Sequence, residues 1–75
     1  MRAYVLVNVH AGKVREVVAA ISQLKGVKHV DACWGVPDVF AYVDTANEKT
    51  LNELVIDQIG KVEGVINTET HIAVD

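Results

Sequence analysis

Two apolar stripes with helical spacing, each ended by a glycine, constrain the fold of this chain most. The first lies in "HAGKVREVVAAISQLKGV", ends at Gly26 and comprises Val14, Val17, Val18, Ile21 and Leu24. The second follows "DTANEKT", ends at Gly64 and comprises Leu51, Leu54, Val55, Ile59 and Val62. Glycine commonly lies just past a helix end, and Asp44, Thr45 or Asn47 is a suitable N-cap for the second stripe. The pattern predicts two amphipathic helices.

Short apolar runs flank the two stripes and predict four strands, Ala3–Val9, Val27–Trp34, Val39–Asp44 and Ile66–Val74. The halves echo each other at an offset of 35 residues, which pairs Ile21, Gln23, Leu24, Val27 and Val30 with Ile56, Gln58, Ile59, Val62 and Val65. The element order is βαββαβ. We therefore predict an α+β fold, a ferredoxin-like βαββαβ sandwich whose antiparallel sheet has the order 4-1-3-2, with both helices on one face. Residues 1–75 would form a single domain.

One face of such a sheet carries no helix. A domain of 75 residues buries only about 60–65% of its unfolded surface, yet 51% of these residues are hydrophobic. The sequence does not say which alternate set of strand residues meets the helices. One face of the first strand (Tyr4, Leu6) and one of the third (Phe40, Tyr42) would be bare. We predict that these residues, with Trp34, form a sheet-to-sheet homodimer interface.

Composition argues against several classes of function. The single cysteine, Cys33, excludes an internal disulfide and suits a reducing cytoplasm. We expect it to be a buried thiol and not a nucleophile, because no adjacent basic group would lower its pKa. The net charge of −3 argues against nucleic-acid binding, because domains that bind nucleic acids usually carry a cluster of basic residues. No apolar run is long enough to span a membrane.

The polar residues offer no catalytic or metal site. His10, His29 and His71 share no ligand spacing, and Cys33 does not belong to a Cys-x-x-Cys pair. We assign no metal, no cofactor and no catalytic residue. An enzyme of the dimeric α+β barrel type is an alternative, but it needs an acid/base pair, and Asp38 is the only acid in a suggestive setting.

Three stretches carry a family resemblance: "AYVLVNV", "GVKHVDACWGVPDVFAYV" and "IGKVEGVINTETHIAV". In this order they resemble the ligand-sensing RAM domain (regulation of amino-acid metabolism) of Lrp/AsnC transcription factors, over nearly the whole chain. The most specific pieces are a Gly-x-x-Asp turn before an apolar strand and a final Gly-Val-x-x-Thr-x-Thr strand. Full regulators of that family also carry a helix-turn-helix domain. None is present here, so we expect a stand-alone RAM protein that does not bind DNA directly.

The resemblance implies an assembly and an effector. Dimers would associate into a ring of eight or ten subunits, an amino acid would bind between dimers, and full-length Lrp/AsnC regulators would be partners. The alternative is an oligomerisation module without a ligand.

The turn "GVPD" is the predicted effector site. Gly35 would let a ligand approach the backbone, and Asp38 would offer a carboxylate to its ammonium group. Backbone amides of the turn would receive the ligand carboxylate. Thr68 and Thr70 belong to a region that lies near the ligand cleft in the resembling domains. The predicted ligand-binding residues are therefore Gly35, Val36, Pro37, Asp38, Thr68 and Thr70. A plain hairpin turn is the simpler interpretation of the same residues.

Overall fold

The computed structural model describes residues 1–74, and it contains the predicted elements in the predicted order. The strands are β1 (Arg2–Val9), β2 (Val27–Ala32), β3 (Val39–Asp44) and β4 (Val65–Ile72). Helix α1 is Val14–Ser22, and the second helical region consists of α2 (Glu48–Asn52), a π-helical segment η1 (Glu53–Gln58) and a 3₁₀ turn η2 (Ile59–Lys61). The antiparallel sheet has the order β2-β3-β1-β4. Read from the other edge this is 4-1-3-2, so the ferredoxin-like fold is confirmed.

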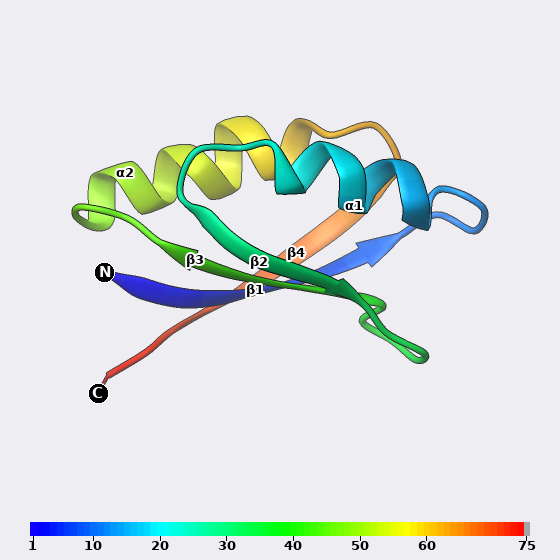
Figure 1. The fold of residues 1–75 in the computed structure, drawn as a ribbon, viewed down its shortest axis with the longest axis horizontal. Helices are drawn as coiled ribbons and strands as arrows, with labels where there is room; N and C mark the ends of the chain where they lie inside the picture. Colours follow the sequence, from blue (N-terminus) through cyan, green and yellow to red (C-terminus); the bar gives the residue numbers. More distant parts are fainter. Residues whose placement is uncertain (75) are drawn as a thin grey trace.

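Both helical regions cover the same face of the sheet, and the opposite face is bare (Figure 1). Strand residues alternate between the two faces, and the core takes the β-branched set. The core comprises Ala3, Val5, Val7 and Val9 of β1, Val39, Ala41 and Val43 of β3, and Val17, Ile21, Leu51, Leu54 and Ile59 of the helical regions. The set with Tyr4, Leu6, Phe40 and Tyr42 therefore faces away from the helices, which decides the orientation that the sequence left open.

The strand ends differ from the sequence prediction by one or two residues. β2 ends at Ala32 and not at Trp34, because the chain enters a loop there that the backbone bond from Cys33 N–H to Asp38 O, 2.8 Å, closes. Cys33 is exposed in that loop, so the expectation of a buried thiol was wrong. β4 begins at Val65 and ends at Ile72.

The second helical region is less regular than its apolar stripe predicts. Of the three candidate caps, Asn47 acts as the N-cap, and its side chain accepts a hydrogen bond from Thr50 N–H at 2.9 Å. This region, Glu48–Lys61, contains more residues than α1, so the 35-residue echo does not align the elements. Val14 and Glu48 begin helices 34 residues apart, whereas Val27 and Val65 begin strands 38 residues apart.

Gly64 positions the start of β4 against helix α1. Its φ of +102° lies in the left-handed region, and a Cβ there would stand 2.8 Å from Lys13 Cβ and 3.1 Å from Val17 Cγ2. Its carbonyl accepts a hydrogen bond from His10 N–H at 2.8 Å. Only glycine permits both this backbone conformation and this close approach.

Candidate functional site

The loop between β2 and β3 exposes two large apolar side chains. It extends past the end of the sheet on the bare side (Figure 1). Trp34 is fully exposed and Val36 is nearly so. Gly35, with a φ of +126°, has no atom within 4 Å of where a Cβ would stand, so backbone conformation and not crowding favours glycine here. Since Trp34 packs against nothing in the described chain, it does not anchor this fold, and its predicted interface role stays a prediction.

Asp38 extends the pairing of β1 beyond the end of β3. The last residue pair of the two strands is Val7 with Val39. Beyond it, Asp38 N–H donates to Val7 O at 3.3 Å, and Asp38 Oδ1 accepts from Val9 N–H at 3.1 Å. The carboxylate thus takes the place of a strand carbonyl. A carboxylate has about four acceptor positions, so this bond leaves Asp38 with capacity for a ligand donor.

A hollow of about 260 Å³ opens beside Asp38, and its lining residues are Asn8, Val9, Val36, Asp38, Ile66 and Asn67. Its polar floor is an amide pair in which Asn8 Nδ2 donates to Asn67 Oδ1 at 2.6 Å. Asn8 Oδ1 is buried without a hydrogen-bond partner, whereas Val36 and Ile66 supply an apolar wall. The hollow therefore offers a carboxylate, amide groups and apolar surface to one small molecule. Neither asparagine is among the predicted site residues, because only the β1–β4 register brings the two together.

The structure separates the two parts of the predicted ligand site. Thr68 pairs with Val7 and Thr70 with Val5, so that both threonines lie on the helix side of the sheet, partly buried. The hollow beside Asp38 lies at the end of the bare face. Within one chain the threonines and Asp38 do not line a common site.

The bare face carries an apolar patch built from the predicted interface residues other than Trp34. Tyr4 pairs with Tyr42 and Leu6 with Phe40 across β1 and β3. The two tyrosine rings have their centroids 5.2 Å apart. Tyr4 is 50% exposed and Phe40 38% exposed, which is unusual for large aromatic residues at the centre of a sheet.

A histidine and a carboxylate adjoin at each edge of the bare face. On β2, His29 Nε2 lies 3.0 Å from Asp31 Oδ2; on β4, His71 Nε2 lies 2.8 Å from Glu69 Oε2. The spacing between the three histidines does not predict these pairs, because each pair joins a histidine to an acid. The available sequence signal was the spacing of two residues, which places both side chains on one face of a strand.

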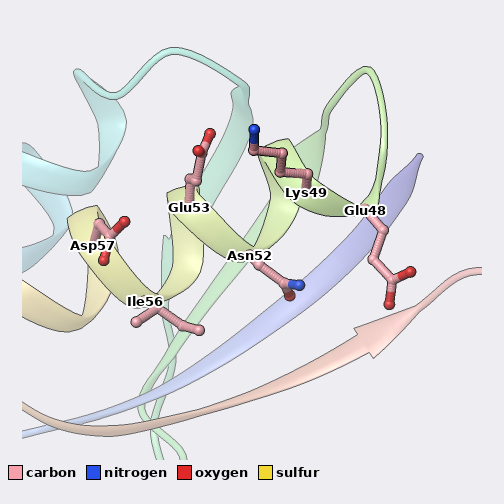
Figure 2. Close-up of a pocket in the computed structure, with 6 residues that line it drawn as sticks. All are labelled: Glu48, Lys49, Asn52, Glu53, Ile56 and Asp57. Atoms are coloured by element: carbon pink, nitrogen blue, oxygen red, sulfur yellow. The ribbon is translucent and has the colours of Figure 1, made fainter.

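A further hollow follows the outer surface of the second helical region and has a volume of about 390 Å³. Figure 2 shows that the side chains lining it splay away from the helix and do not converge: Glu48, Lys49, Asn52, Glu53, Ile56 and Asp57. Such a surface is typical of a solvated helix face. Among residues 1–74 no three His, Cys, Asp or Glu side chains converge to hold a metal ion, and no helix there is long and apolar enough to cross a membrane.

The relatives of this chain show the family to which it belongs. Residues 2–75 match the family described as the Lrp/AsnC ligand binding domain. This chain belongs to the Lrp/AsnC family. An uncharacterised HTH-type transcriptional regulator of Pyrococcus furiosus is 36% identical over 70 residues, which cover 93% of this chain and 47% of the relative. The chain thus spans about half the length of the curated relatives it matches.

Two solved structures superpose closely on this chain. The crystal structure of TTHA0845 from Thermus thermophilus has a TM-score of 0.93 and 31% identity, and the match covers 99% of this chain and 92% of that one. The transcriptional regulator NMB0573 of Neisseria meningitidis, described as an L-Met complex, has a TM-score of 0.86 at 18% identity, with 99% of this chain and 49% of that one covered. At that identity the second likeness shows the fold alone.

Proposed function

We propose that this chain is an amino-acid-sensing regulatory module that responds to its effector through a change of assembly. The observation that carries the proposal is the half-buried Asp38 carboxylate, which lies in a hollow with an amide floor and an apolar wall. An amino acid presents an ammonium group, a carboxylate and a side chain, and such a site suits that combination. The family is one of ligand-binding domains of transcriptional regulators, and one structural relative is described with L-Met.

Each residue of the turn has a distinct task in this proposal. The Asp38 carboxylate pairs with the ligand ammonium group as a charge-assisted hydrogen bond. Gly35 exposes the backbone, so that amides of the turn, that of Val36 among them, meet the ligand carboxylate, and Pro37 restricts the backbone of the turn. Thr68 and Thr70 lie on the other face of the sheet. They would therefore contribute their hydroxyls only from a different subunit.

The proposed assembly begins with a second copy of the chain on the bare face. An isologous dimer would cover Tyr4, Leu6, Phe40 and Tyr42 with the same patch of its partner. Dimers would then join into an octamer or decamer, with the exposed Trp34 loop near the contacts between dimers. An effector bound there shifts the equilibrium only by its differential affinity for the two assembly states.

The proposed role in the cell is regulatory and not catalytic. The module would act on transcription through full-length Lrp/AsnC regulators and would make no DNA contact of its own, in keeping with its net charge of −3. The free, exposed Cys33 suits a reducing compartment, and we propose the cytoplasm.

The decisive experiment is a thermal-shift screen against the twenty amino acids, with sedimentation velocity alongside. One or a few amino acids should raise the melting temperature in a saturable manner. Asp38→Asn is the matched variant, because its amide oxygen can still accept the bond from Val9 N–H while the ligand loses its ionic partner. We expect this variant to fold and to lose the response. An unchanged response would remove Asp38 from the site.

An oligomerisation module without an effector is the second candidate, and the full exposure of Trp34 favours it. A ring that forms without any amino acid, and whose melting temperature no amino acid changes, would select this function. The "GVPD" turn would then be an assembly contact. Trp34→Ser should break such a ring into dimers, whereas it should leave the melting of the isolated dimer unchanged.

A further inference from the structure

The bare face is ordered in rows that run across the strands. One row reads His29, Tyr42, Tyr4, His71, and the next reads Asp31, Phe40, Leu6, Glu69. Aromatic and aliphatic residues occupy the centre of both rows. Imidazoles end the first row and carboxylates end the second, so each edge strand, β2 and β4, presents one histidine next to one acid.

The spacing of the donor atoms suits a shared metal ion. The nitrogen and oxygen lie 3.0 Å apart in the His29–Asp31 pair and 2.8 Å apart in the His71–Glu69 pair. Two ligands that bind one tetrahedral zinc ion at about 2.0–2.2 Å have their donor atoms roughly 3.3–3.6 Å apart. Each pair, which without the ion is held at hydrogen-bond distance, therefore needs to open by only about half an ångström to bind it. Each pair can thus supply two ligand atoms to one ion. Zinc sites in proteins commonly use three or four protein ligands, and residues 1–74 of one chain bring no three such side chains together.

A second copy on the same face completes the set. Two stacked sheets that pack in the aligned manner lie about 10 Å apart, and side chains from both sides meet at that spacing. If the two-fold axis runs along the strands, β2 lies over β4 of the partner. If it runs across the strands, β2 lies over β2 and β4 over β4. In both arrangements each edge of the dimer collects two imidazoles and two carboxylates.

We propose that the sheet-to-sheet dimer binds two divalent transition-metal ions of the zinc class, one at each edge, through His29, Asp31, Glu69 and His71 of the two copies. The inference rests on the dimer of the proposed function. Imidazole nitrogen with carboxylate oxygen is a donor set that zinc accepts. The ion neutralises carboxylates that would otherwise face each other with like charge, so metal tightens the dimer.

The remaining charges on this face do not compete for the ion. Arg2 and Asp44 form the adjacent row at the strand ends. Asp44 Oδ1 is already 3.3 Å from the ammonium group of Met1. His10 lies outside β1 and makes its backbone bond to Gly64. This histidine therefore offers a matched control.

The test uses metal-stripped protein, zinc chloride and two readouts. Calorimetry should give about one zinc ion per chain, and sedimentation should show that the dissociation constant of the dimer falls about tenfold or more with saturating zinc, since a ligand of the dimer alone stabilises it by mass action. Cobalt(II) in place of zinc should give the visible d–d absorption that is typical of a four-coordinate site. His10→Ala should match the wild type in every readout.

Single variants then report the direction of the two-fold axis. With the axis along the strands, His29→Ala removes a ligand from both sites and abolishes tight binding. With the axis across the strands, it removes one site and halves the stoichiometry. Circular dichroism checks that each variant folds.

Three outcomes overturn the proposal. Zinc binding that persists in the double variant His29→Ala with His71→Ala would show adventitious binding. A dimer that is stable without zinc and does not bind it would refute the metal sites and leave the proposed dimer intact. A monomer at every protein concentration, with or without zinc, would refute the dimer as well.

Discussion

Replacing Asp38 by alanine should destabilise the fold itself and not only remove a ligand contact. The carboxylate accepts the Val9 N–H at 3.1 Å, and Val9 is only 7% exposed. Val9 also lies where the β1–β4 register shifts. Alanine at position 38 therefore leaves the buried Val9 N–H without a hydrogen-bond acceptor, because no strand carbonyl lies opposite it.

The magnitude follows from the cost of such an unpaired group. A buried donor that loses its partner costs about 1–3 kcal/mol. For a domain of 60–100 residues, each 1 kcal/mol lowers the melting temperature by about 4–8 °C. We expect Asp38→Ala to lower it by roughly 5–20 °C. Asp38→Asn, which keeps an acceptor oxygen, should lose less than about 1 kcal/mol.

Urea denaturation followed by circular dichroism measures the difference, and several protein concentrations separate folding from assembly. Hydrogen exchange of the Val9 amide gives a local readout, since this proton should exchange faster in the alanine variant than in the asparagine variant. Equal stability of both variants and wild type, with unchanged exchange at Val9, would refute a structural role for Asp38.

The other predictions concern a glycine, a helix cap and the bare face. Gly64→Ala forces a side chain into a φ of +102° and within 2.8 Å of Lys13 Cβ; it should cost about 2 kcal/mol or more in denaturation, and a loss below about 0.5 kcal/mol would contradict the packing described. Asn47→Ala removes the acceptor for Thr50 N–H and should cost about 1 kcal/mol in the same assay; an unchanged midpoint would show that the cap is dispensable. Leu6→Lys places a charge in the centre of the apolar patch, so sedimentation should report a folded monomer; a dimer as tight as the wild type would exclude the bare face as the interface.

Local pattern determined much of the fold. Apolar spacing gave both helices, because an amphipathic helix must repeat every three or four residues to bury one side. Alternation along β1 and β3 separated Val5 and Val7 from Tyr4 and Leu6, because a strand sends successive side chains to opposite faces. These signals lie within a few residues of each other. Sequence reasoning therefore found the element order and the sheet order, whereas the interface role of the bare-face residues stays a prediction.

Sequence reasoning reached only part of the candidate site. It found the glycine and the aspartate of the "GVPD" turn, because turns have local residue signatures. It did not find the exposure of Cys33, since burial depends on how the loop leaves the sheet. Nor did it find the structural bond of Asp38 to Val9, which joins residues 29 positions apart.

Register and loop path were decided by the tertiary structure. The pairing of β1 with β4 sets Thr68 and Thr70 against the core side and Asn67 beside Asn8 on the other. The same pairing, continued through β3 to β2, aligns the imidazoles in one row and the carboxylates in the next. A shift of one residue in a strand would exchange its two faces. The sequence therefore determines which chemical groups the chain carries, and the packing of distant strands determines which of these groups can act together.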